Sequence, residues 1–315
     1  MIRTQKTIYN SISAESKGLH SGRNITVTLK PAPANSGIIF HRIDLPGAEA
    51  LLASVENVQS TQLATTLGEG ENRISTVEHL MAALVSLGID NVLVECSGPE
   101  LPVFDGSAEP WVELINQAGL RDLGLPRRVY LVTRPFRITD GDKSIEVLPA
   151  SCFSIEAIID FNGAIGRQGL CYVDGDQSFV KEISRARTFC YLKDVEFMHS
   201  KGLALGGGLE NAVVVGDDGI LNPEGLRYDD EFVRHKVLDF IGDLGMAGAP
   251  IIGRFIITKP GHELNRRFVA EALAEPGLLK PATVSAEGFI SKDSVRPSLR
   301  PSISVDEGRW APATA

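Results

Sequence analysis

The sequence lacks the features of secreted, membrane-spanning and disulfide-stabilised proteins. It has only four cysteines in 315 residues, none of them in a C-x-x-C pair, and reduced thiols within apolar runs behave as small hydrophobic residues. The first seven residues lack the apolar stretch of a signal peptide, and no run approaches the ~18 apolar residues that a membrane span requires. We therefore expect a cytoplasmic protein with no membrane span.

Positive charge and nucleotide-binding motifs are also scarce. The 31 basic residues are outnumbered by 40 acidic ones, for a net charge of −9, whereas nucleic-acid binding needs a concentrated positive field. We expect no nucleic-acid partner. The phosphate-loop pattern G-x-x-x-x-G-K-[ST], a G-x-G-x-x-G fingerprint after a strand and the G-x-S-x-G elbow are all missing, so nucleoside triphosphate chemistry, dinucleotide redox chemistry and serine hydrolysis lose support.

What remains is the composition of an ordinary folded protein, with 43% hydrophobic and 23% charged residues. The chain is longer than one typical domain of ~100–200 residues. Apolar periodicity and turn residues predict strands and helices in a recurring order. The expected strands are 25–29, 37–40, 91–95, 129–133, 144–148, 153–159 and 251–257, and the expected helices are 79–87, 109–118, 176–184 and 229–244.

The second half of this pattern resembles the first, which suggests a weak internal duplication. We predict an α+β fold of two similar domains, each a mostly antiparallel sheet packed with helices. The boundary falls near residue 126, giving an N-terminal domain 1–126 and a C-terminal domain 127–280. The remaining residues, 281–315, contain prolines and serines without an apolar period and are expected to form a loosely ordered tail.

The predicted helix 229–244 carries His235-x-x-x-Asp239, followed by Asp243. Residues four apart stack on one face of a helix, so the imidazole and the carboxylate can converge on one metal ion. A surface ion pair is the alternative, and spacing alone favours it. Asp243 fits that alternative less well, because the surrounding apolar stripe predicts a buried helix, where carboxylates are usually paired or metal-bound.

Glu78-His79 offers a base beside a ligand, which is what hydrolysis at a metal needs. Catalytic zinc keeps three protein ligands and one open position. The alternative is a capping box, in which Glu78 bonds back to Ser75 at the start of the helix. His262 follows a strand end and could act as a general acid or merely cap the next helix.

Other polar residues are less informative on their own. His20, His41 and His199 have no acidic or histidine partner at ligand spacing, and we expect them at the surface, although the turn around His20 could border a site. The segment Arg185-Ala-Arg-Thr-Phe189 provides two cations and a hydroxyl.

Taken together, these segments resemble the zinc-dependent UDP-3-O-acyl-N-acetylglucosamine deacetylases over about residues 1 to 280. The matching segments occur in order and are far more specific than any one motif. They are Gly18-Leu-His-Ser-Gly22, Ile74-Ser-Thr-Val-Glu-His-Leu80, Gly88-Ile-Asp-Asn91, Asp105-Gly-Ser107, Ile183-Ser-Arg-Ala-Arg-Thr-Phe189, Gly202-Leu-Ala-Leu-Gly-Gly207, Phe232-Val-Arg-His-Lys236 and Pro260-Gly-His262.

The resemblance implies hydrolysis of the N-acetyl group of UDP-3-O-acyl-N-acetylglucosamine to UDP-3-O-acyl-glucosamine and acetate, in lipid A biosynthesis. It implies that Zn2+ is bound at the interface of the two domains, although iron(II) suits the same ligands. The implied metal ligands are His79, His235 and Asp239. The implied catalytic residues are Glu78 as the base, Thr188 at the oxyanion, and His262 oriented by Asp243.

The resemblance also implies substrate contacts. It places Lys236 near the diphosphate, Phe189 among the substrate-binding residues, and Lys143, Asp160, Phe161 and Lys259 near the nucleotide. An insert near 190–205 would form a tunnel for the acyl chain. The alternatives are solvated lysines and a core helix in place of the insert. The chain departs from several members at Ala64, where they carry a cysteine near the metal.

Two other functions compete with this one. The chain could be a non-catalytic protein that binds a nucleotide sugar or an acyl group around a structural metal, but such metals normally have four protein ligands. It could instead be a zinc hydrolase for another acylated amide. For the favoured function we expect a monomer whose partner is its small-molecule substrate.

Overall fold

The computed structural model describes residues 4–175, 177–285 and 288–291. In the first half, short strands precede and enclose two helices. The elements are β1 (Thr4–Ile8), β2 (Ile12–Lys17), β3 (Asn24–Pro31), β4 (Ile38–Arg42), β5 (Leu51–Leu52), a 3-10 turn (Val55–Asn57), β6 (Val58–Ser60), β7 (Thr66–Leu67), α1 (Glu78–Ser86), β8 (Val92–Cys96), α2 (Glu109–Ala118) and β9 (Leu120–Pro126). Pro110 lies in the first turn of α2, where its missing N–H costs no hydrogen bond.

The second half repeats this order with an insertion. Its elements are β10 (Arg128–Val132), β11 (Phe136–Asp140), β12 (Lys143–Leu148), β13 (Ser154–Asp160), β14 (Arg167–Val173), α3 (Ser178–Glu182), β15 (Phe189–Tyr191), α4 (Leu192–Ser200), β16 (Val213–Val215), α5 (Glu231–Leu244), a 3-10 turn (Gly245–Ala247), β17 (Ile251–Ile252), β18 (Arg254–Thr258), α6 (His262–Ala274), β19 (Leu279–Ser285) and β20 (Gly288–Ser291).

The two large sheets share one topology. The first has the order β2-β3-β8-β4-β5 and the second β11-β12-β18-β13-β14. In both, the middle strand pairs antiparallel with one neighbour and parallel with the other. In both, one helix precedes the middle strand and another follows it. These helices are α1 and α2 for β8, and α5 and α6 for β18. The predicted α+β fold of two similar units is confirmed.

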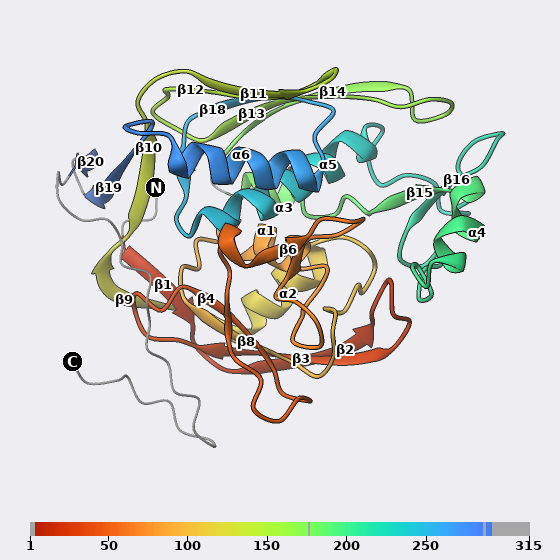
Figure 1. Cartoon of the computed structure of the whole chain (residues 1–315), viewed down its shortest axis with the longest axis horizontal. Coiled ribbons are helices and arrows are strands. Elements are labelled where there is room, and N and C mark those ends of the chain that lie inside the picture. The colour runs from red at the N-terminus through yellow and green to blue at the C-terminus, as the bar shows by residue number, and fades with distance from the viewer. Residues whose placement is uncertain (1–3, 176, 286–287, 292–315) are drawn as a thin grey trace.

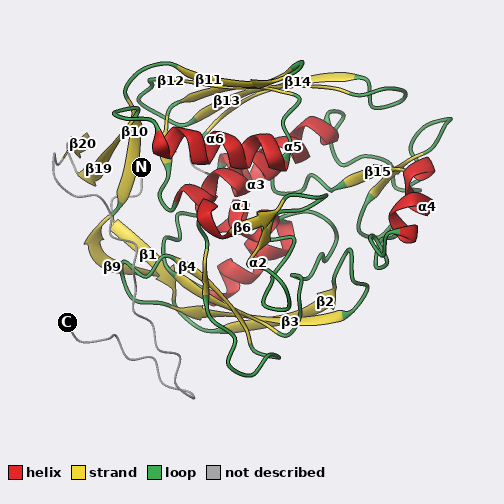
Figure 2. Ribbon diagram, viewed as in Figure 1, coloured by secondary structure: helices red, strands yellow, loops and turns green. Residues whose placement is uncertain are grey.

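The helices occupy a layer between the two sheets, and the α4 region projects at one side (Figures 1 and 2). At the centre, α1 packs against α5 at very short range. A Cβ atom added to Gly242 would lie 2.1 Å from the carbonyl oxygen of Glu78, so only glycine permits this approach. The predicted burial of α5 is confirmed, since Asp243 and the apolar residues beside it are buried. Glu78 and α5 are thereby held together.

Some local predictions are wrong. The capping box does not form, because Thr76 adopts a left-handed φ of 59° and α1 begins after Val77 with no side-chain cap. The predicted strand 251–257 is divided at Gly253 between two sheets. The first part of the expected tail is not loose, since β19 pairs with β10, while residues 292–315 lie outside the described part.

Two observations concern the surface. Among the described residues, no helix is both long and apolar enough to cross a lipid bilayer. Helix α4 has no buried residue, and Leu192 and Phe197 on it are exposed. The alternative of a core helix at this position is therefore excluded.

Candidate metal centre

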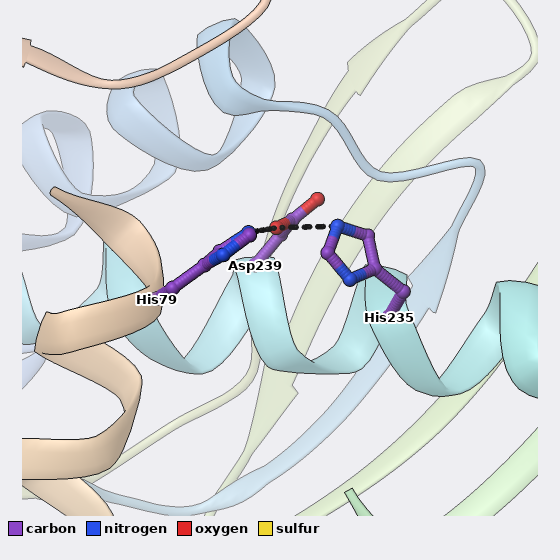
Figure 3. A group of neighbouring side chains, drawn as sticks. All are labelled: His79, His235 and Asp239. Carbon is purple, nitrogen blue, oxygen red and sulfur yellow. Dashed lines mark ion pairs between the residues drawn. The ribbon is translucent and has the colours of Figure 1, made fainter. Parts of the chain in front are cut away.

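Three side chains from two helices converge where α1 crosses α5 (Figure 3). His79 lies in the first turn of α1, and His235 and Asp239 lie one turn apart on α5. The Asp239 Oδ1 atom is 3.6 Å from His79 Nε2 and 3.3 Å from His235 Nε2. All three residues are buried, and their candidate ligand atoms lie within 4.8 Å of one another. The structure therefore brings together residues that are 156 positions apart in the sequence.

The hydrogen bonds of this group fit a metal ion. Asp239 Oδ1 is buried and has no hydrogen-bond partner, whereas Oδ2 accepts a bond from Lys236 Nζ at 2.8 Å. His235 Nδ1 lies 3.1 Å from the carbonyl oxygen of Ala186. Because a carbonyl only accepts, Nδ1 must carry the proton, which leaves the Nε2 lone pair free for a ligand. Two imidazoles and a carboxylate suit Zn2+, and also iron(II).

The electrostatics favour the forms that bind a cation. Burial lowers the pKa of His235 to about 3, despite the opposing effect of Asp239, so its imidazole is neutral. Burial alone would raise the pKa of Asp239, but the Lys236 ammonium at 2.8 Å holds it well below its usual range. A neutral imidazole and an ionised carboxylate are the forms in which these groups bind a metal.

A second polar cluster adjoins the first and contains three predicted residues. His262 Nδ1 lies 2.8 Å from Asp243 Oδ2, and His262 Nε2 lies 4.0 Å from Glu78 Oε1. Thr65 joins them, because its N–H donates to Glu78 Oε2 at 3.0 Å and its hydroxyl to Asp243 Oδ1 at 2.5 Å. Asn265 also donates to Asp243 Oδ2 at 2.8 Å. The Asp243 carboxylate is therefore fixed at both oxygens.

The sequence arguments missed Thr65 and Asn265. Thr65 directly follows Ala64, the position where the chain departs from several family members, and this neighbourhood was the only available signal. Asn265 follows His262 by three residues, so the two lie on one face of α6.

Within this second cluster, the pKa values of the acid and the base are shifted in ways that suit proton transfer. Burial raises the pKa of Glu78, which makes it a better proton acceptor. Burial by itself would lower the pKa of His262, but the Asp243 carboxylate reverses this and raises it to about 9. At neutral pH a protonated imidazole thus faces a carboxylate of increased basicity.

Thr188 is held by its backbone, whose N–H donates to Gly106 and whose carbonyl accepts from Val213, both at 2.8 Å. Thr188 lies two residues after Ala186, whose carbonyl binds His235. In the described part of the chain its side chain joins neither cluster by a hydrogen bond or ion pair. Thr188 is therefore linked to the site through the main chain, because Ala186 bonds to His235.

A row of pairwise contacts links predicted substrate residues to Lys236, beside the metal group. Lys236 Nζ lies 5.6 Å from the ring centre of Phe189, and that ring is 5.6 Å from the ring of Phe161. Lys259 Nζ lies 3.3 Å from Asp160 Oδ2. Strands β12 and β18 pair Ser144 with Thr258, which puts Lys143 at the same end of the sheet as Lys259.

Of the remaining histidines, only His199 is exposed. His20 is half-buried, with its Nε2 atom lacking a hydrogen-bond partner. Burial lowers the pKa of His20, and the nearby charge of His262 adds to this effect. His20 is therefore more enclosed than we expected of a surface residue. His41 is also half-buried.

Known proteins that are similar to this chain belong to the family that the sequence motifs resemble. The profile of the UDP-3-O-acyl N-acetylglycosamine deacetylase family matches residues 5–274. A relative from Geobacter sp. (strain M21) is 47% identical over 273 residues, which cover 86% of this chain and 90% of the relative. One from Anaeromyxobacter dehalogenans (strain 2CP-C) is 45% identical over 311 residues, or 98% of each chain. Both are named UDP-3-O-acyl-N-acetylglucosamine deacetylase.

Proposed function

Because the chain belongs to the UDP-3-O-acyl N-acetylglycosamine deacetylase family, we propose that it hydrolyses UDP-3-O-acyl-N-acetylglucosamine in lipid A biosynthesis. The products are UDP-3-O-acyl-glucosamine and acetate. The observation that carries this proposal is the unpartnered, buried Asp239 Oδ1 between two imidazoles, beside the carboxylate of Glu78. A structural metal site would more commonly offer a fourth protein ligand.

We assign Zn2+ to His79, His235 and Asp239. When bound, the ion supplies Lewis acidity towards the acetamide carbonyl and lowers the pKa of water near it. The Lys236 ammonium keeps Asp239 ionised and takes up its second oxygen, so the carboxylate presents one free oxygen to the site.

The proton transfers are carried by the second cluster. Glu78, whose pKa is raised by burial, takes a proton from the attacking water as the new C–O bond forms. The Thr188 hydroxyl donates to the oxyanion, a stabilisation worth about 3 kcal/mol. As the C–N bond breaks, the leaving amine takes a proton from Glu78 or from His262, which Asp243 keeps protonated.

The substrate lies along the row that starts at the metal group. The diphosphate faces Lys236. Phe189 packs between Lys236 and Phe161, and the ring of Phe161 stacks on uracil. Lys143, Asp160 and Lys259 contact the nucleotide at the end of the sheet. The exposed apolar residues of the 190–205 insert line the path of the acyl chain. A long acyl group needs such an apolar surface, since each buried CH2 contributes about 0.8 kcal/mol.

We also propose the domain boundaries, the location and the oligomeric state of the protein. The domains are 1–126 and 127–280, with the site at their interface and 281–315 as an extension. The protein works as a cytoplasmic monomer on its small-molecule acylated UDP-sugar substrate.

The decisive experiment combines metal analysis with an assay of acetate release. The purified protein should hold about one zinc ion and release acetate from UDP-3-O-acyl-N-acetylglucosamine, but much more slowly from analogues without UDP or without the acyl chain. The variant Glu78→Ala should stay folded and lose about 10²–10⁴-fold in kcat, while Glu95→Ala on β8 keeps its activity. Unchanged turnover in Glu78→Ala would defeat the assignment of the base.

Chelation separates this function from a binding protein with a structural metal. A chelator should remove activity and leave the circular dichroism spectrum intact. Unfolding on chelation would indicate a structural metal instead.

A further inference from the structure

The proposed chemistry leaves the two arginines of the segment 185–189 without a role, and they differ in exposure. The Arg185 side chain is 49% exposed and lies 3.5 Å from Glu109. Arg187 is only 2% exposed, so it is not available to a substrate. A charge at that depth needs a specific reason, because burying an ion costs several kcal/mol before any partner is found.

Arg187 is bound on every side by groups near the start of α5. Its Nε atom donates to Glu231 Oε1 at 2.9 Å and its Nη2 to Glu231 Oε2 at 3.2 Å. Nη1 donates to Glu224 at 2.5 Å, and Nη2 also donates to the carbonyl of Gly225 at 2.7 Å. The planar fork of arginine is what allows this arrangement, and a lysine ammonium cannot reproduce it.

Glu231 ties the backbone of the segment to the same point. It is the first residue of α5 and is fully buried. Besides the guanidinium, its Oε1 accepts the backbone N–H of Arg187 at 2.9 Å, and its Oε2 accepts the N–H of Arg227 at 2.7 Å. One carboxylate therefore fixes residue 187 by both its side chain and its main chain.

This attachment lies between two groups of the proposed site. The carbonyl of the preceding residue, Ala186, accepts the Nδ1 proton of His235, one helical turn beyond Glu231. The following residue is Thr188. The stretch 186–188 and the first turn of α5 thus form a closed ring of contacts, through Arg187–Glu231 on one side and Ala186–His235 on the other.

We propose that Arg187 is a positioning residue, which holds residues 186–188 against the start of α5 and so sets the orientation of the His235 imidazole and of the Thr188 hydroxyl. The inference rests on the proposed function and deepens it. Stability alone is a weak explanation for the pair, since buried ion pairs can often be replaced by apolar residues without loss of stability. Groups that orient a metal-binding histidine affect metal affinity or activity by roughly 10–100-fold.

Arg42 provides a matched control in the first half of the chain. It is also buried, at 4% exposure, and binds the carboxylate of Asp44 through Nε and Nη2. Its Nη1 donates to the carbonyls of Glu71 and Arg73 at 2.9 Å. No residue assigned to the site takes part in these bonds.

The test compares Arg187→Lys with Arg42→Lys. Metal-free protein is titrated with Zn2+ against a competing chelator, folding is checked by circular dichroism, and kcat and KM are measured on the zinc-loaded protein. For Arg187→Lys we expect about tenfold weaker zinc binding and a lower kcat with KM little changed. Arg42→Lys should bind zinc and turn over substrate as the wild type does, whatever its thermal stability.

The variant Glu231→Gln serves if Arg187→Lys does not fold. It keeps one oxygen for the N–H and Nε of Arg187 and should also weaken zinc binding and lower kcat. A folded variant of either kind with wild-type zinc affinity and kcat overturns the inference. So does failure of both to fold while Arg42→Lys folds, because the pair is then purely structural. If the wild type itself binds no zinc, the proposed function fails instead.

Discussion

The two halves of the molecule have the same sheet topology but contribute differently to the site. In the first half, α1 offers both of its ionisable groups, Glu78 and His79, at its first turn. In the second half, α5 offers His235, Asp239 and Asp243 at successive turns along one face. The helix after the middle strand also differs, since α6 begins with His262 whereas α2 begins with Glu109, which pairs with Arg185 outside the two clusters.

This difference shows how a duplicated scaffold can support one asymmetric site. The repeated sheets and helices bring α1 and α5 together at the centre, and the residues on them decide the chemistry. Within the described residues, the three candidate ligands come from both halves, and they meet only where the two helices cross. Substitutions in either half can show how far each half depends on the other.

The largest expected effect comes from removing one imidazole from either half. His79→Ala and His235→Ala should each weaken zinc binding by at least about 100-fold, since each removes one of three ligands. Equilibrium titration with zinc measures this, with His199→Ala on the exposed helix α4 as the control. If either histidine can be lost without a change in zinc affinity, that half does not contribute to the metal site.

Next comes the ion pair His262–Asp243 of the second half, for which the described residues of the first half offer no counterpart. The pKa of His262 is raised to about 9 in the folded protein, whereas the ordinary value for histidine is ~6.5. The stabilisation of the fold by this pair is therefore fully present below pH ~6.5. This contribution is lost as the pH rises through about 9. In metal-free Asp243→Asn, the pKa of His262 should fall well below that of the wild type.

Proton NMR of the His262 ring and urea unfolding between pH 6 and 10 measure these two quantities. The stability difference between wild type and Asp243→Asn should shrink across this range. A His262 pKa that is the same in both proteins contradicts the role of Asp243.

A smaller effect is expected where the halves touch. A methyl group at Gly242 would meet the backbone of Glu78 at 2.1 Å, whereas at Gly245 it would meet only side-chain ends of Val85 and Met81 at 2.9–3.0 Å. Gly242→Ala should therefore destabilise the protein by about 1–3 kcal/mol and also weaken zinc binding. Gly245→Ala should cost less and leave zinc affinity unchanged. Equal effects in denaturant unfolding would show that the helix crossing tolerates movement.

The smallest effect should come from the ion pairs that involve the middle strands of the two sheets, Lys30–Glu95 between β3 and β8 and Arg254–Glu156 between β13 and β18. Both pairs are partly solvent-exposed, so Glu95→Gln and Glu156→Gln should each change the free energy of unfolding by less than about 1 kcal/mol. Denaturant unfolding of the two variants checks this. A loss of several kcal/mol in only one would show that the sheets differ in how they are held together.

Much of this organisation could be predicted from the sequence, because apolar periodicity and turn residues are local signals. The strands β3, β4, β8, β12 and β13 and the helices α1, α2 and α5 all lie within a few residues of their predicted positions. The i,i+4 spacing of His235 and Asp239 also predicted that they share one face. The repeated order of elements predicted the common topology of the sheets.

Contacts between distant segments were beyond these signals. The Thr65 hydroxyl meets Asp243 across 178 positions, and Ala186 acts through its carbonyl, which any residue possesses. The capping-box pattern was misleading at Glu78, because its carboxylate binds Thr65 instead of Ser75. A local motif was overruled there by the tertiary position of the side chain. The burial of Arg187 was likewise invisible in a segment that reads as polar.

The central feature of the proposed site is one metal ion shared by the two halves. Anomalous diffraction at the zinc edge from zinc-loaded crystals tests this directly. We predict one strong peak within roughly 2.0–2.2 Å of His79 Nε2, His235 Nε2 and an Asp239 oxygen. A peak bound by residues of only one helix, or the absence of a peak between α1 and α5, would contradict it.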